Sequence, residues 1–70
     1  MGKVGRLRRE VKLRTWRQER GVTQEELAKK AKVTKRYISQ LETGLRQNPS
    51  LPVLRRLAKA LGVSVGELLE

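Results

Sequence analysis

Apolar residues recur at helical spacing in two short segments between residues 23 and 44. They fall at positions i, i+1 and i+4 in the first segment and at i and i+3 in the second, so each segment has one apolar and one polar face. The apolar residues are Leu27, Ala28 and Ala31 in the first segment and Ile38 and Leu41 in the second. This pattern predicts two short amphipathic helices joined by a tight turn.

Polar residues at the segment boundaries favour the same two helices. Thr23 is a preferred N-cap residue, and Glu26 three positions later completes a capping box. Thr34 is placed to cap the second helix, and Gly44 to end it. Lys32 occupies a turn position where a positive φ is expected, which implies either a strain of roughly 1 kcal/mol or a turn that avoids the left-handed region.

The residues before this pair predict a basic amphipathic helix that begins at Leu7 and ends at Gly21. Its apolar positions on neighbouring turns are Leu7, Val11, Leu13 and Trp16. We interpret Trp16 as a core residue rather than a platform for stacking. Such a helix could also lie on an anionic membrane, but the following segments offer it a core on which to pack.

The residues after the pair predict a loop and two further helices. Ser50 is a good N-cap for a helix over residues 51–61, which Gly62 ends. The apolar face of this helix consists of Leu51, Leu54, Leu57, Ala58 and Leu61. Ser64 and Glu67 form a second capping box, which predicts a short helix over residues 65–70.

The chain is therefore predicted to be all-α, a compact five-helix bundle with no strand pattern, repeat or linker. Residues 1–10 are interpreted as a basic N-terminal arm and the start of the first helix, and residues 11–70 as a single domain. A 70-residue chain buries only about 60% of its unfolded surface, so its stability depends on good packing or on association.

The outward face of the second central helix carries side chains that form hydrogen bonds readily. Arg36 and Gln40 lie opposite the apolar pair on a helical wheel, with Lys35 and Ser39 beside them. Exposed residues of these types are usually only solvated. On a helix-turn-helix, however, Arg pairs bidentately with guanine O6 and N7, and Gln with adenine N6 and N7. Two roles fit Tyr37: stacking on sugar-phosphate, or covering the edge of the core beside Val33.

Charge strengthens the interpretation as a binding surface. The formal net charge is +10, and residues 1–20 carry eight of the 17 Lys and Arg residues. Basic surface can serve solubility alone, and thermostable proteins are also rich in charged residues. Combined with a helix-turn-helix, it favours a polyanionic partner, nucleic acid before membrane.

Composition also disfavours several classes of protein. The chain has no cysteine and no histidine, which removes disulfides, thiolate zinc sites and the commonest general base. The seven carboxylates are predicted to be exposed on helices or to have structural roles. We therefore expect no enzyme activity, no cofactor and no metal. There is no apolar run of 18 residues and no apolar signal region, so an intracellular, cytoplasmic protein without a membrane partner is expected.

Together these features resemble the Cro/repressor-type helix-turn-helix family, also called the XRE family. The resemblance covers about residues 11–70, and its parts are specific only in combination. They are the runs Arg17–Ala28, Val33–Thr34, Ile38–Gly44, Pro49–Leu51 and Leu57–Ser64. The resemblance implies a phage-repressor-like DNA-binding domain whose third helix, residues 34–43, enters the major groove of double-stranded DNA, commonly as a homodimer on a palindromic operator.

The resemblance also implies roles for individual residues. The base-reading positions are Lys35, Arg36, Ser39 and Gln40. Positions for phosphate or secondary contacts are Gln24, Thr34, Tyr37, Arg46, Asn48 and Arg14, although Arg46 and Asn48 could equally be surface residues. Arg17 and Glu42 match a pair that the family often buries between helices 1 and 3. The helix macrodipole disfavours a carboxylate at the end of a helix, so Glu42 is expected to have a partner.

Three positions depart from the family pattern. Thr43 stands where Asn is usual, Lys32 replaces the usual turn glycine, and the loop from Gly44 to Pro49 is one residue longer than the commonest spacing. Loop residues are therefore not assigned to particular phosphates.

The first functional hypothesis is a sequence-specific DNA-binding transcriptional regulator that acts as a repressor. The alternative is an antitoxin that represses its own operon and blocks a toxin partner through another surface. A DNA-binding fragment of a longer regulator or an RNA-binding adaptor is a third interpretation. Only residues 1–10 are spare for a toxin, which favours the first hypothesis.

Overall fold

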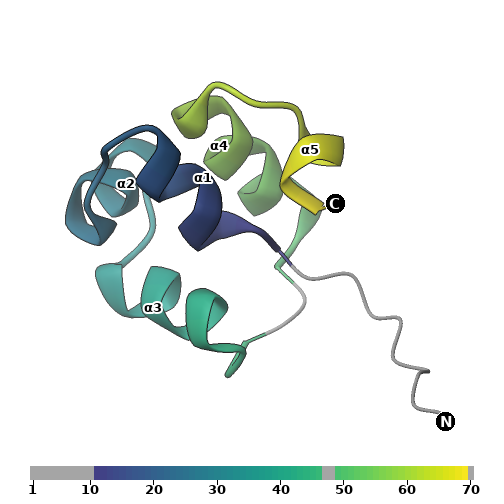
Figure 1. Cartoon of the computed structure of the whole chain (residues 1–70). Helices are drawn as coiled ribbons and strands as arrows, with labels where there is room; N and C mark the ends of the chain where they lie inside the picture. The colour runs from purple at the N-terminus through teal and green to yellow at the C-terminus, as the bar shows by residue number, and fades with distance from the viewer. Residues whose placement is uncertain (1–10, 47–48, 70) are drawn as a thin grey trace, which may run out of the picture.

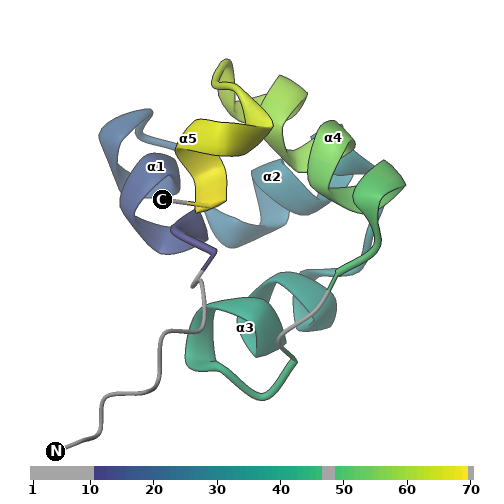
Figure 2. The same cartoon turned by 90° about the vertical axis from the view of Figure 1, so that its right-hand side faces the viewer.

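The computed structural model describes residues 11–46 and 49–69, and within them the chain forms helices and no strand, as predicted. The helices of the described residues are α1 (Leu13–Glu19), α2 (Gln24–Ala31), α3 (Lys35–Thr43), α4 (Leu51–Leu61) and α5 (Val65–Leu69). Figures 1 and 2 show α3 along one side of the molecule, with the other four helices on the opposite side of it.

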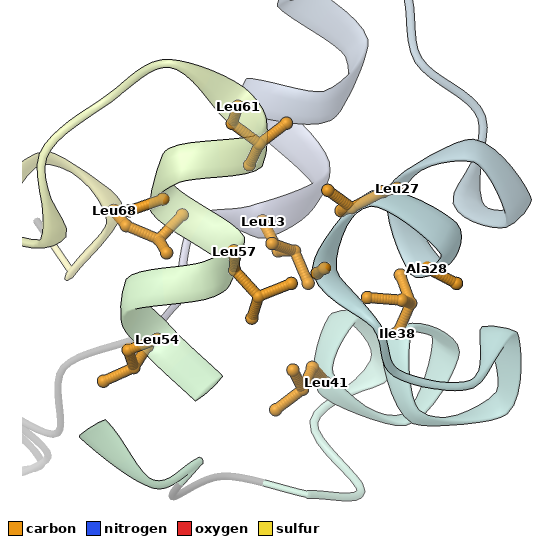
Figure 3. Packing of buried hydrophobic residues seen from close by; sticks show 11 residues of the cluster. Leu13, Leu27, Ala28, Ile38, Leu41, Leu54, Leu57, Leu61 and Leu68 are labelled. Carbon is orange, nitrogen blue, oxygen red and sulfur yellow. The ribbon is translucent and has the colours of Figure 1, made fainter. Parts of the chain in front are cut away.

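All five of these helices contribute to one apolar core (Figure 3). The helix α2 packs against both α3 and α4. Each helix supplies one fully buried large side chain, and these are Leu13, Leu27, Ile38, Leu57 and Leu68 in chain order. Since burying a leucine or isoleucine side chain contributes roughly 1.5–3 kcal/mol, these five residues hold the helices together.

Both predicted capping boxes are present. At the start of α2, the Glu26 backbone N–H donates to Thr23 Oγ1 at 3.0 Å, and the Thr23 N–H donates to Glu26 Oε1 at 2.9 Å. The same reciprocal pair joins Ser64 and Glu67 at the start of α5, at 3.0 and 2.8 Å. These bonds satisfy backbone donors that a helix cannot satisfy by itself.

Single side-chain caps begin α3 and α4. The Tyr37 N–H donates to Thr34 Oγ1 at 3.0 Å at the start of α3. The Val53 N–H donates to Ser50 Oγ at 3.4 Å at the start of α4. Both observations confirm the predicted N-cap residues.

In the turn between α2 and α3, Lys32 adopts the strained one of the two predicted conformations. This residue has φ 60° and ψ 45°, in the left-handed region. The N–H of Lys32 donates to the Lys29 carbonyl at 3.3 Å, and that of Val33 donates to the Ala28 carbonyl at 3.0 Å. Gly62 ends α4 with the same pair of bonds and a φ of 71°. A Schellman motif therefore ends both α2 and α4. The left-handed residue is glycine at the end of α4, whereas at the end of α2 it is Lys32, whose side chain makes this conformation strained.

The predicted start of the first helix is wrong. The helix α1 begins at Leu13 rather than Leu7, and both Val11 and Lys12 lie outside it. Lys12 is the N-cap of α1, and its N–H donates to the Leu68 carbonyl in α5 at 2.8 Å. The predicted residues 7–10 lie outside the described residues, as does the arm.

The predicted burial of Leu51 is also wrong. Leu51 was predicted to lie on the apolar face of the helix over residues 51–61, but it is 52% exposed. Leu51 is the first residue of α4, whose buried side chains begin at Leu54. Periodicity places Leu51 on the correct face of the helix but cannot tell that the core ends before the first turn.

Trp16 packs against the core, as interpreted from its spacing. Its indole Nε1–H donates to the Glu67 carbonyl of α5 at 3.3 Å. The Arg20 guanidinium lies 5.2 Å from the centre of the ring. Trp16 therefore connects α1 to α5, and Arg20 lies over its ring.

Candidate nucleic-acid interface

The outer face of α3 carries the four predicted base-reading residues. Lys35 and Arg36 are exposed, whereas Ser39 and Gln40 are half-buried. Ile38 and Leu41 point into the core on the other side of the helix. Pairs four residues apart are neighbours on a helix, so these polar side chains form a strip along the outer face of the helix.

An ion pair holds the end of α3 against α1. Arg17 Nε donates to Glu42 Oε2 at 2.7 Å, and Arg17 Nη2 donates to Glu42 Oε1 at 3.0 Å, which is a bidentate arrangement. Arg17 Nη1 also donates to the Val22 carbonyl at 3.0 Å, in the turn between α1 and α2. The two side chains are 13% and 4% exposed, so the pair expected from the family resemblance is present and largely shielded from solvent.

Gln24 joins the same carboxylate from the first turn of α2. Its Nε2 donates to Glu42 Oε1 at 3.0 Å. Glu42 therefore accepts hydrogen bonds from both α1 and α2 while it belongs to α3. This arrangement fixes the orientation of Gln24, which the resemblance assigns either to phosphate contact or to support of the reading residues.

The charges of this cluster favour its ionised form. Burial by itself would raise the pKa of the Glu42 carboxyl, but the hydrogen bonds from Arg17 and Gln24 and the charges of Arg17 and Arg14 hold the pKa below its usual range. The hydrogen bond to Glu42 raises the pKa of Arg17, against the opposite effect of burial. Arg14 is itself exposed on α1, close enough to act on Glu42 through its charge.

A second polar cluster lies just beyond the end of α3. Arg46 Nε donates to Gln40 Oε1 at 3.2 Å, and the Arg46 backbone N–H donates to the Gln40 carbonyl at 3.1 Å. The Arg46 guanidinium also lies 5.1 Å from the centre of the Tyr37 ring. Tyr37 is half-buried and packs against the core beside α3. Tyr37 therefore covers the edge of the core, which is one of its two predicted roles, and Arg46 lies over its ring.

Two arginines have structural partners that the sequence pattern did not indicate. Arg20 Nε donates to the Leu61 carbonyl at 2.8 Å at the end of α4, and Arg56 Nε donates to the Ala31 carbonyl at 2.8 Å at the end of α2. Cations are favoured at the C-terminus of a helix. Part of the basic charge is therefore used inside the fold, and contacts so distant in sequence leave no local pattern.

The remaining predicted site residues are less closely connected. Thr34 caps α3 with its hydroxyl oxygen and is otherwise exposed. Asn48 lies outside the described residues. Over residues 11–46 and 49–69, no group of three or more acidic residues is arranged to hold a metal ion. No helix in this part of the chain is long and apolar enough to cross a membrane.

Comparison with known proteins identifies the same motif. A family described as helix-turn-helix matches residues 13–68. The HTH-type transcriptional regulator SinR of Bacillus subtilis (strain 168) is 41% identical over 59 residues, which cover 84% of this chain and 53% of SinR. The immunity repressor protein of Bacillus phage phi105 is 39% identical over 57 residues, which cover 81% of this chain and 39% of the repressor. The chain thus spans about half the length of SinR, and less of the phage protein.

The fold also matches a solved complex. The crystal structure of the master regulator for biofilm formation SinR in complex with DNA superimposes with a TM-score of 0.79 at 41% sequence identity, over 83% of this chain and 92% of that chain. The family match covers most of the chain. This chain therefore belongs to the helix-turn-helix family, in its Cro/repressor-type (XRE) branch.

Proposed function

We propose that this protein binds double-stranded DNA in a sequence-specific manner and regulates transcription as a repressor, with α3 in the major groove. The observation that carries the proposal is the polar strip on α3, which faces outward while the opposite side of the helix is locked into the core. The likeness to a regulator solved in complex with DNA and to a phage immunity repressor supports it.

The four residues of the strip have base-reading roles in this proposal. Arg36 donates to guanine O6 and N7, and Lys35 adds a second cationic donor beside it. Ser39 and Gln40 contact base edges one turn further along the helix. Phosphate or secondary contacts are assigned to Gln24, Thr34, Tyr37, Arg46, Asn48 and Arg14.

The protein is further proposed to act as a homodimer on DNA, with two half-sites about one helical turn apart, roughly 34–36 Å. A single domain of this size offers little surface for tight binding. The proposed contact between the two copies is the loop 45–49 together with the end of α4 and with α5. Leu45 is 80% exposed in this segment and Leu51 is 52% exposed just after it, so both offer apolar area that a second copy would cover.

The test is selection of bound duplexes from a random pool at two salt concentrations. We expect a palindromic consensus, and we expect Arg36→Ala and Gln40→Ala each to weaken binding to it by about 1–3 kcal/mol and to relax the preference at one base pair. Lys30→Ala is the matched control, because Lys30 is exposed on α2 away from the strip. Equal losses on consensus and random duplexes would show that neither residue reads bases. Footprints over only one half-site at saturating protein would refute the dimer.

A further inference from the structure

The contact between Arg46 and Gln40 restricts how Gln40 can present its amide. A guanidinium has only hydrogen-bond donors, so the Gln40 atom that faces Arg46 Nε at 3.2 Å must be the oxygen Oε1. The amide nitrogen Nε2, with its two N–H donors, is therefore turned to the other side. A free glutamine can rotate its amide by half a turn to interchange donor and acceptor, whereas this one is held in one of the two orientations.

Two further contacts hold Arg46 in place. Its backbone N–H donates to the Gln40 carbonyl at 3.1 Å, which keeps the chain close to the last turn of α3. The Tyr37 ring lies under its guanidinium at 5.1 Å, and Tyr37 in turn packs against the core. Cation–π contacts of this kind are favourable even at partly exposed sites. The side chain that orients Gln40 is thus itself oriented from two directions.

We propose that Arg46 is a positioning residue that sets the base preference of Gln40. With Oε1 engaged by Arg46, Gln40 recognises bases by donation from Nε2. It therefore favours an edge that offers acceptors, guanine with O6 and N7 first and thymine with O4 second. Adenine is less favoured, because a bidentate contact to its N6 and N7 would require Oε1 to accept from N6 as well as from the Arg46 cation, whereas guanine offers two acceptors to Nε2. This inference rests on the proposed function, since it assumes that α3 reads the major groove.

The test compares selected duplexes for the parent protein, Arg46→Met and Gln40→Ala. The position whose preference Gln40→Ala relaxes identifies the base pair that Gln40 reads. We expect the parent to select guanine or thymine there. We expect Arg46→Met to shift the ratio toward adenine by at least about fivefold, the lower limit for one specific base contact. Arg46→Met should have no effect at that position when Gln40 is already alanine.

Arg55→Met is the matched control, because it removes the same charge from an exposed position on α4. It should weaken binding, if at all, equally for all sequences and leave the preference unchanged. Tyr37→Leu removes the ring under Arg46 and should shift the preference in the same direction as Arg46→Met. Circular dichroism establishes that each variant is folded at the assay temperature, and a variant that is not folded is assayed at a lower temperature.

The outcomes separate the inference from the proposed function. If the parent selects adenine at the Gln40 position, or if Arg46→Met weakens all sequences equally, Arg46 contacts phosphate only and the inference is overturned. The same holds if Gln40→Ala changes no preference while Arg36→Ala does. If the parent selects no consensus at all, it is the proposed function that fails.

Discussion

The ion pair between Arg17 and Glu42 permits a sharp prediction about stability. Removing one member of a buried pair leaves the other without compensation, which typically costs about 3–5 kcal/mol, whereas an exposed pair contributes about 0–1 kcal/mol. Side-chain exposures of 13% and 4% place this pair near the buried limit. A domain of this size has a total stability of about 3.5–10 kcal/mol. We therefore expect Arg17→Ala and Glu42→Ala each to bring the fold close to unfolding at pH 7.

The two single variants should not be equal. In Glu42→Ala the guanidinium keeps its bond to the Val22 carbonyl and some access to water. In Arg17→Ala the more deeply buried carboxylate keeps only the bond from Gln24. We expect Arg17→Ala to be the more destabilised at pH 7. Its deficit should shrink as the pH is lowered, because protonation of Glu42 removes the buried charge.

The assay is thermal unfolding followed by circular dichroism at pH 7. At about 4–8 °C per kcal/mol, a loss of about 3 kcal/mol lowers Tm by about 12–24 °C. Arg55→Ala is the control, since it removes an exposed positive charge from another helix, α4. An Arg17→Met and Glu42→Leu double variant should recover much of the loss, because no charge remains buried. Single variants that melt within a few degrees of the parent would refute the reasoning.

Three further predictions follow from the geometry. The pKa of Glu42 is held below its usual range, so its stabilising effect should be complete above about pH 4.5 and disappear as the pH falls through the lowered pKa. When unfolding is measured from pH 7 to 2, Glu42→Gln should therefore lose less stability in acid than the parent does. Lys32→Gly should raise Tm by a few degrees, since glycine relieves a strain of about 1 kcal/mol at φ 60°, whereas Lys32→Ala retains the strain and should not. If DNA binding involves six to ten phosphate contacts, the affinity for DNA should fall roughly 10³–10⁵-fold between about 50 and 200 mM salt. Removal of residues 1–9 should reduce this salt dependence if the arm contacts phosphate. A flat salt dependence would contradict a role of the basic charge in DNA binding.

The sequence predicted best those features whose chemistry is local. A capping box needs only two residues three positions apart, and both boxes form as expected. The core could also be predicted, because helical periodicity reports directly which side chains are turned inward. For Lys32 the sequence allowed either a strained left-handed residue or a turn that avoids this region. The hydrogen bonds that end α2 go with the strained conformation.

Features that depend on contacts distant in sequence could not be predicted from the pattern. At the start of α1 Lys12 bonds to α5, and the partners of Arg20 and Arg56 lie at the ends of other helices. The link from Arg46 to Gln40 crosses the turn after α3, where no periodicity applies. Arg17 and Glu42 are an exception, since the family resemblance paired them across 25 residues.

The position of Glu42 explains why a carboxylate is found at a helix end that the macrodipole disfavours. Apolar contacts hold α3 against the core, but they are not directional, and they alone would tolerate small rotations of the helix about its axis. Bonds from Arg17 and Gln24 to one carboxylate are directional and come from two other helices, so they fix that rotation. A reading surface needs such precision, since its side chains must meet base edges within about 0.5 Å. The proposed function therefore makes orientation, more than stability, the reason for burying this pair: an apolar pair of similar volume could hold the helices together without fixing the rotation of α3.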